Sequence, residues 1–169
     1  MDAAKLGPET LGVDETLRPR VGYSAGAYDL FHIGHLNLLK RAKSHCDYLI
    51  AGVVSDEMLR ENKGIEPVIP LAERLEIVSH IDMVDRAVAE VVPDKLETWR
   101  QLHFDVFFKG DDWRGTREGL RLEREFAEVG VEVIYFPYTL STSSTQLRRA
   151  LATINGTAPA ARARSGGSR

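Results

Sequence analysis

The sequence is short of cysteine, of long apolar runs and of excess charge, and each shortage narrows the class of protein. Cys46 is the only cysteine among 169 residues, so no internal disulfide can form, which fits a reducing cytoplasm. No apolar run approaches the roughly 20 residues that a membrane span requires, and the polar N-terminus does not resemble a signal peptide. A formal net charge of −3 argues against nonspecific nucleic-acid binding. We therefore expect a cytoplasmic protein with no membrane insertion and no nucleic-acid partner.

What the sequence does contain is a regular alternation of strand patterns and helix patterns. Hydrophobic residues make up 43% of the chain and charged residues 28%, which is enough apolar surface for one compact core. Short apolar runs predict strands at 21–25, 48–54, 86–92, 104–109 and 131–136, and the stretches between them predict helices. The alternation predicts an α/β fold, a single domain with a Rossmann-like, doubly wound, parallel five-stranded sheet.

The two ends of the chain differ in composition from the rest. Residues 1–19 show no sustained periodicity and contain Gly7-Pro8 and Pro19, which indicates a mobile N-terminal leader. Residues 154–169 are mostly Ala, Arg, Gly and Ser, a composition that predicts a disordered tail. We therefore expect the folded domain to span residues 20–153.

The stretch from Val21 to His45 runs from an apolar strand, through a turn of small residues, into a helical pattern. His32 and His35 lie three residues apart at the expected helix start, and Gly34 between them lets another group approach the backbone. The free N–H groups of a helix N-terminus suit an anion, so the pattern favours a phosphate site. Two other interpretations stay open. One histidine caps the helix while the other packs, or the pair binds a metal, although no third ligand is nearby in sequence.

Polar turns follow three of the predicted strands. They are the histidine turn, the Gly110-Asp111-Asp112-Trp113 turn and the Ser/Thr cluster at Ser141–Thr145. The carboxyl ends of parallel strands meet at one rim of the sheet, where ligands bind. We therefore expect the three turns to form a single site.

The histidine turn resembles the signature of a known family. Residues Gly26 to His35 read GAYDLFHIGH and resemble the GTFDxxHxGH signature of the HxGH nucleotidyltransferases. The Gly110–Trp113 turn and the Ser/Thr cluster resemble those of glycerol-3-phosphate cytidylyltransferases, and the resemblance covers about residues 21–151. It implies transfer of CMP from CTP to a small phosphorylated polyol, giving CDP-glycerol and pyrophosphate for cell wall biosynthesis. It also implies Mg²⁺ delivered with the triphosphate and a homodimer.

The resemblance assigns catalytic and nucleotide-binding roles to particular side chains. The catalytic roles fall to His32, His35, Lys63 and Arg74. The nucleotide-binding roles fall to Gly26, Ala27, Asp29, Gly34, Gly110, Asp111, Asp112, Trp113, Thr142, Ser143, Ser144 and Thr145. Without the resemblance, Lys63 and Arg74 are expected to be ordinary solvated side chains. Asp29 is then expected to cap the histidine turn, and the hydroxyls of residues 142–145 to cap a helix. Arg148 is a weaker candidate.

Two positions depart from the family pattern. Ala27 stands where the family has threonine, and Tyr138 stands where an RTEGIST-like segment has arginine. Tyrosine supplies neither a charge nor a bidentate fork, so the identity of the acceptor is open. The alternatives are phosphoethanolamine or a hydroxyalkyl phosphonate as acceptor, adenylyl transfer, or a nucleotide-binding regulatory module without turnover.

Overall fold

The structure is a computed structural model that describes residues 18–137, 139 and 142–156. Five strands and six α-helices alternate along the chain, with a short 3-10 helix at Asp111–Trp113. The strands are β1 (Val21–Gly26), β2 (Tyr48–Val54), β3 (Arg86–Glu90), β4 (Val106–Gly110) and β5 (Glu132–Phe136). The helices are α1 (Ile33–Lys43), α2 (Asp56–Lys63), α3 (Leu71–Ser79), α4 (Lys95–Leu102), α5 (Arg117–Glu128) and α6 (Ser144–Ile154).

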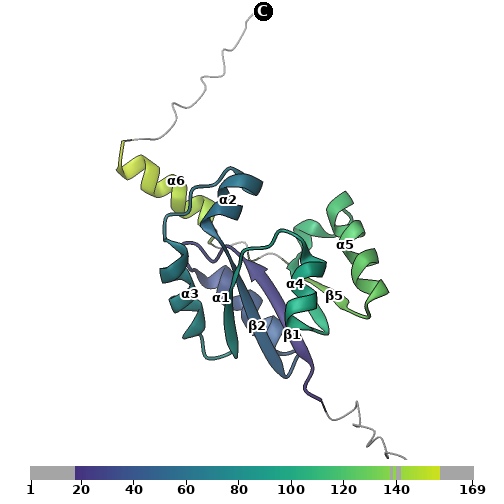
Figure 1. Cartoon of the computed structure of the whole chain (residues 1–169). Coiled ribbons are helices and arrows are strands. Elements are labelled where there is room, and N and C mark those ends of the chain that lie inside the picture. The colour runs from purple at the N-terminus through teal and green to yellow at the C-terminus, as the bar shows by residue number, and fades with distance from the viewer. Residues whose placement is uncertain (1–17, 138, 140–141, 157–169) are drawn as a thin grey trace, which may run out of the picture.

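All five strands are parallel and lie in the order β3-β2-β1-β4-β5. Helices α1 and α3 cover one face of the sheet, and α4 and α5 cover the other (Figure 1). The strand order reverses between β1 and β4, so the switch point lies between their carboxyl ends, where α/β sheets bind ligands. The predicted five-stranded doubly wound fold is confirmed.

Each face of the sheet has its own apolar core, because successive side chains of a strand point to opposite faces. On one face Leu39 of α1 and Val78 of α3 belong to the same apolar cluster as Phe108 of β4. On the other, Phe126 of α5 packs against Phe107, with ring centroids 5.3 Å apart. Burial on both faces explains why the strands read as continuous apolar runs.

Side-chain caps fix the starts of several helices. Ser55, Asp94 and Thr116 each accept a backbone N–H from the first turn of the helix that follows. The last helix reaches Ile154, one residue past the expected end of the domain. Residues 1–17 of the expected leader, residues 157–169 of the expected tail and Tyr138 lie outside the described residues. Across the described ranges, no helix combines the length and the apolar character that crossing a membrane would take.

Candidate active site

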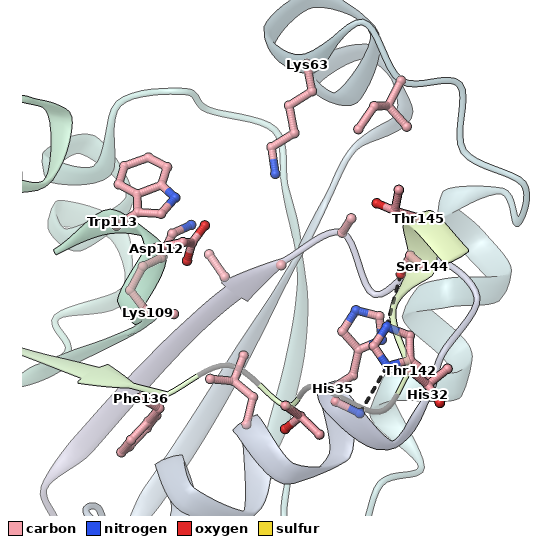
Figure 2. Close-up of a pocket in the computed structure, with 18 of the residues that line it drawn as sticks. His32, His35, Lys63, Lys109, Asp112, Trp113, Phe136, Thr142, Ser144 and Thr145 are labelled. Atoms are coloured by element: carbon pink, nitrogen blue, oxygen red, sulfur yellow. Dashed lines mark hydrogen bonds between the residues drawn. The ribbon is translucent and has the colours of Figure 1, made fainter. Parts of the chain in front are cut away.

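A cavity of about 310 Å³ opens at the carboxyl ends of β1 and β4, the switch point of the sheet. That volume lies at the lower end of the range for small-molecule sites. Figure 2 shows side chains from both halves of the sheet converging on this space. The predicted site residues that line the cavity are Gly26, Ala27, His32, Gly34, His35, Lys63, Gly110, Asp112, Trp113, Thr142, Ser144 and Thr145. The three polar turns therefore do meet in one place.

The turn between β1 and α1 has an uncommon backbone. Tyr28 and Leu30 both have φ of 51°, a left-handed conformation that non-glycine residues seldom adopt. The Tyr28 ring is buried, and its hydroxyl donates to the carbonyl of Ser24 at 3.1 Å. Residues held in such conformations persist only where the surrounding contacts over-determine them, and they gather at functional sites.

Asp29 supplies much of that support. Its carboxylate is fully buried and accepts the backbone N–H groups of Val68 and Ile69 at 3.1 and 3.0 Å. The same carboxylate pairs with Arg148 of α6, whose Nη1 lies 2.8 Å away. Asp29 does not line the cavity. It ties the histidine turn to the loop before α3 and to α6, which agrees with the structural alternative for this residue.

His32 both caps α1 and faces the cavity. Its Nδ1 accepts the backbone N–H of Gly34 at 3.0 Å, so the proton of the neutral ring sits on Nε2. Nε2 lies 3.2 Å from Ser144 Oγ, which in turn donates to the carbonyl of Asp29 at 2.8 Å. Glycine is needed next to this ring, because a Cβ at Gly34 would lie 2.7 Å from His32 Cε1. The capping and binding interpretations of His32 are therefore compatible.

His35 stacks on His32, with ring centroids 4.0 Å apart. The rings of Tyr28 and Phe31 pack beside it at 5.4 Å, and its Nδ1 is buried with no hydrogen-bond partner in the described part of the chain. Burial, and then the neighbouring His32, lower the pKa of His35 to about 3. Burial also lowers the pKa of His32. At neutral pH the pair therefore offers hydrogen-bond donors without positive charge.

The start of α6 forms the opposite wall of this end of the cavity. Ser143 accepts the N–H of Gln146, and the Gln146 side chain accepts the N–H of Ser143, a capping box. Thr142, Ser144 and Thr145 line the cavity, whereas Ser143 does not. The Ser/Thr cluster therefore combines both expected arrangements. Ser143 caps the helix, and its neighbours face the cavity.

The other end of the cavity is formed by β4 and the 3-10 helix. Asp112 and Trp113 lie there together with Lys109, well apart from the histidines (Figure 2). Lys63 extends from the end of α2 toward the cavity. Asp111 is exposed and does not line the cavity. Lys109 was not singled out from the sequence, although its place at the carboxyl end of a parallel strand is a signal for it.

Arg74 does not line the cavity, and its catalytic role stays a prediction. Its side chain is fully buried. Its guanidinium donates to the carbonyl of Ala27, to that of Val54 at 2.9 Å and to that of Ile69 at 2.8 Å. It also pairs with Asp56 Oδ1 at 2.5 Å. With these acceptors occupying its N–H groups, Arg74 fastens the histidine turn, the end of β2 and the loop before α3 to one another.

The metal interpretation of the histidines requires further ligands. Within the described ranges, no three His, Cys, Asp or Glu side chains lie close enough together to hold a metal ion. The geometry instead presents imidazole N–H groups, hydroxyls, lysines and two helix starts to one space. These groups suit the oxygens of phosphates.

The fold and the cavity together define a nucleotidyltransferase. The chain belongs to the Cytidylyltransferase-like family, whose model matches residues 23–150. The family resemblance inferred from the histidine turn is therefore confirmed, and the protein is an enzyme.

Individual relatives differ in what their names say they do. The chain is 36% identical over 137 residues to glycerol-3-phosphate cytidylyltransferase of Bacillus spizizenii, covering 76% of this chain and 95% of that protein. It is 33% identical over 116 residues to FAD synthase of Thermococcus sibiricus, covering 68% and 78%. It is also similar to the crystal structure of the lipopolysaccharide core biosynthesis protein of Thermoplasma volcanium, with a TM-score of 0.62, 26% identity and coverage of 72% and 98%. The shared reaction class is clear, and the substrate is not fixed by similarity.

Proposed function

We propose that this enzyme transfers the cytidylyl group of CTP to a small phosphorylated polyol, glycerol 3-phosphate, and releases pyrophosphate. The observation that carries the proposal is the stacked pair of His32 and His35 at the start of α1, facing a cavity that the start of α6 also borders. Two helix starts and two imidazoles directed at one space suit a chain of phosphates.

The reaction requires positioning more than covalent help from the protein. A phosphate oxygen of the acceptor attacks the α-phosphorus of CTP, a new P–O bond forms, and the bond to the β-phosphate oxygen breaks as pyrophosphate leaves. The ionised acceptor oxygen carries no proton, so no general base is needed. In this scheme His35 donates a hydrogen bond to an oxygen that gains charge in the transition state, and the Nε2–H of His32 turns from Ser144 Oγ to a second such oxygen.

The similarity in sequence supports this acceptor. The alignment with glycerol-3-phosphate cytidylyltransferase covers 95% of that protein and 76% of this chain. The magnesium that accompanies a triphosphate would take its ligands from phosphate oxygens and water, since the described residues group no three carboxylate or imidazole ligands.

A second candidate is adenylyl transfer to a different acceptor, favoured by the 33% identity to an FAD synthase. The fold and the His32–His35 pair would serve both reactions, because they contact the phosphates and not the base. Only the nucleotide and the acceptor would change.

The test compares nucleotides and acceptors in one assay. Pyrophosphate release is followed with CTP or ATP against glycerol 3-phosphate, phosphoethanolamine, a hydroxyalkyl phosphonate and FMN. The proposal predicts that CTP with glycerol 3-phosphate gives the highest kcat/KM. A higher value for ATP with FMN would replace it with the second candidate, and release with no acceptor but water would contradict both.

A further inference from the structure

Lys109 is a cation without an acceptor inside the cavity. It lies near the carboxyl end of β4, its side chain is half-buried, and its Nζ lies 4.2 Å from the centroid of the Trp113 ring. Within the part of the chain that the structure describes, its ammonium makes no hydrogen bond and no ion pair. An ammonium carries three donors, and burying it without acceptors is unfavourable unless another group supplies them.

The charges around Lys109 leave the local field positive. Burial, together with Lys63 of α2 and Lys95 of α4, lowers the pKa of Lys109 to about 8, while Glu90 and Asp112 act in the opposite direction. The carboxylate of Glu90 is buried and already engaged, because it pairs with Lys95 and accepts the Tyr23 hydroxyl. Asp112 raises the pKa of Lys109 through its charge, but within the described residues the two side chains form no salt bridge. The ammonium is therefore not neutralised from within the fold.

The rest of the cavity supplies little free positive charge. Both histidines are neutral at physiological pH, and the guanidinium of Arg148 is paired with the buried carboxylate of Asp29. Arg41 donates to the carbonyl of Pro137 at 2.9 Å. Two cations that line the cavity, Lys63 and Lys109, have no hydrogen-bond or ion-pair partner in the described part of the chain. Lys109 lies at the end of the cavity opposite the histidines, and Lys63 extends toward that end (Figure 2).

We propose that Lys109 is a substrate-binding residue that, with Lys63, holds phosphate oxyanions at the end of the cavity opposite His32 and His35. The inference rests on the proposed function, because nucleotidyl transfer places phosphate oxygens on both sides of the reacting phosphorus. The phosphate comes either from the nucleotide or from the acceptor, and the two sources are separable by experiment.

The test measures binding without turnover, by calorimetric titration of pyrophosphate, CTP and glycerol 3-phosphate into the wild type and K109M. Methionine retains much of the side-chain volume and removes the charge. We expect K109M to bind at least one of these probes at least tenfold more weakly. Weaker binding of CTP and pyrophosphate assigns the site to the nucleotide, and weaker binding of glycerol 3-phosphate alone assigns it to the acceptor. K40M is the matched control, since Lys40 is exposed on α1 outside the cavity, and it should bind within twofold of the wild type.

The pH dependence gives a second readout that a purely structural lysine would not show. The wild type should lose affinity as the pH rises through about 8, where Lys109 loses its proton, and K109M should not. This readout uses CTP and glycerol 3-phosphate, whose last phosphate pKa is about 6, so their own charge is constant there. Circular dichroism and Tm establish that K109M is folded.

Affinities of folded K109M within twofold of the wild type for all three probes would overturn the proposal. So would a wild type that binds none of them, or a K40M variant that weakens binding as much as K109M does. None of these outcomes depends on turnover, so a failure of the proposed reaction would be seen separately as missing pyrophosphate release.

Discussion

His32 Nε2 lies 3.2 Å from Ser144 Oγ, which joins the first turn of α1 to the first residue of α6 across 112 positions of sequence. Because Ser144 Oγ donates its own proton to the carbonyl of Asp29, it accepts from the imidazole. With Nδ1 held by the N–H of Gly34, the ring is fixed as the tautomer that carries its proton on Nε2, facing Ser144 Oγ at the cavity wall. Ser144 is thus a positioning residue for His32.

Ser144→Ala should lower kcat by roughly fivefold with a smaller change in the KM for CTP, on the scale of about 1 kcal/mol for one neutral hydrogen bond. Ser144→Thr keeps the hydroxyl and should restore most of the rate. Ser143→Ala is the matched control, because Ser143 caps α6 and does not line the cavity. It should lower stability by about 1 kcal/mol while kcat changes little. Equal rates for Ser144→Ala and the wild type would show that this contact does not orient His32.

His32→Ala and His35→Ala should each reduce kcat far more than they weaken CTP binding. Each removes a donor aimed at charge that develops only in the transition state, at a cost of about 3 kcal/mol, or roughly a hundredfold in rate. Single-turnover rates and equilibrium titration with CTP separate the two effects. Rates within a few-fold of the wild type at saturating substrate would remove the histidines from the chemistry.

Arg74→Met should lower the free energy of unfolding, and any loss of activity should follow from that loss of stability. The substitution removes the Arg74 donor from Asp56 Oδ1 and from three carbonyls, and breaking a buried pair costs about 3–5 kcal/mol. Urea unfolding should show a clear fall in the midpoint. Arg60→Met, which removes an exposed pair with Glu66, should leave that midpoint almost unchanged. A folded Arg74→Met protein with wild-type stability and no activity would instead favour the catalytic role that the resemblance implied.

Burial of His35 should make the folded protein sensitive to acid. Its pKa is about 3 in the fold against 6.5 for a free histidine, so between these values the unfolded chain binds more protons. Stability should therefore be fully present above pH 6.5 and fall as the pH drops toward 3. His35→Asn should flatten this dependence, and His80→Gln, at an exposed histidine after α3, should not. Parallel slopes for the wild type and His35→Asn between pH 7 and pH 4.5 would contradict the assignment.

The sequence predicted the sheet and most of the cavity because both follow from local patterns and one rule of topology. Apolar runs located the strands, and the parallel arrangement required that the turns after β1 and β4 and the Ser/Thr cluster meet at one rim. His32, Lys63, Trp113 and Ser144 reach the same cavity for that reason. Their individual roles stay predictions.

The sequence could not separate residues that contact a ligand from residues that support the turn. Arg74 reads as a surface cation on a helix, yet it is buried by carbonyls from three other segments, none of them on its own helix. Asp29 likewise owes its place to backbone groups about 40 positions away. Lys109 belongs to an apolar strand pattern, which gives no sign of a binding role. That its ammonium has no acceptor depends on how α2, β3 and α4 pack around it.

The most direct test of the account is phosphorus NMR of the enzyme incubated with CTP, glycerol 3-phosphate and magnesium, with His32→Ala run in parallel. We predict that the CTP resonances are replaced by those of a diphosphodiester, CDP-glycerol, and by pyrophosphate in equal amounts, with the variant roughly a hundredfold slower. Unchanged CTP in the presence of glycerol 3-phosphate, or conversion at the same rate by His32→Ala, would contradict it.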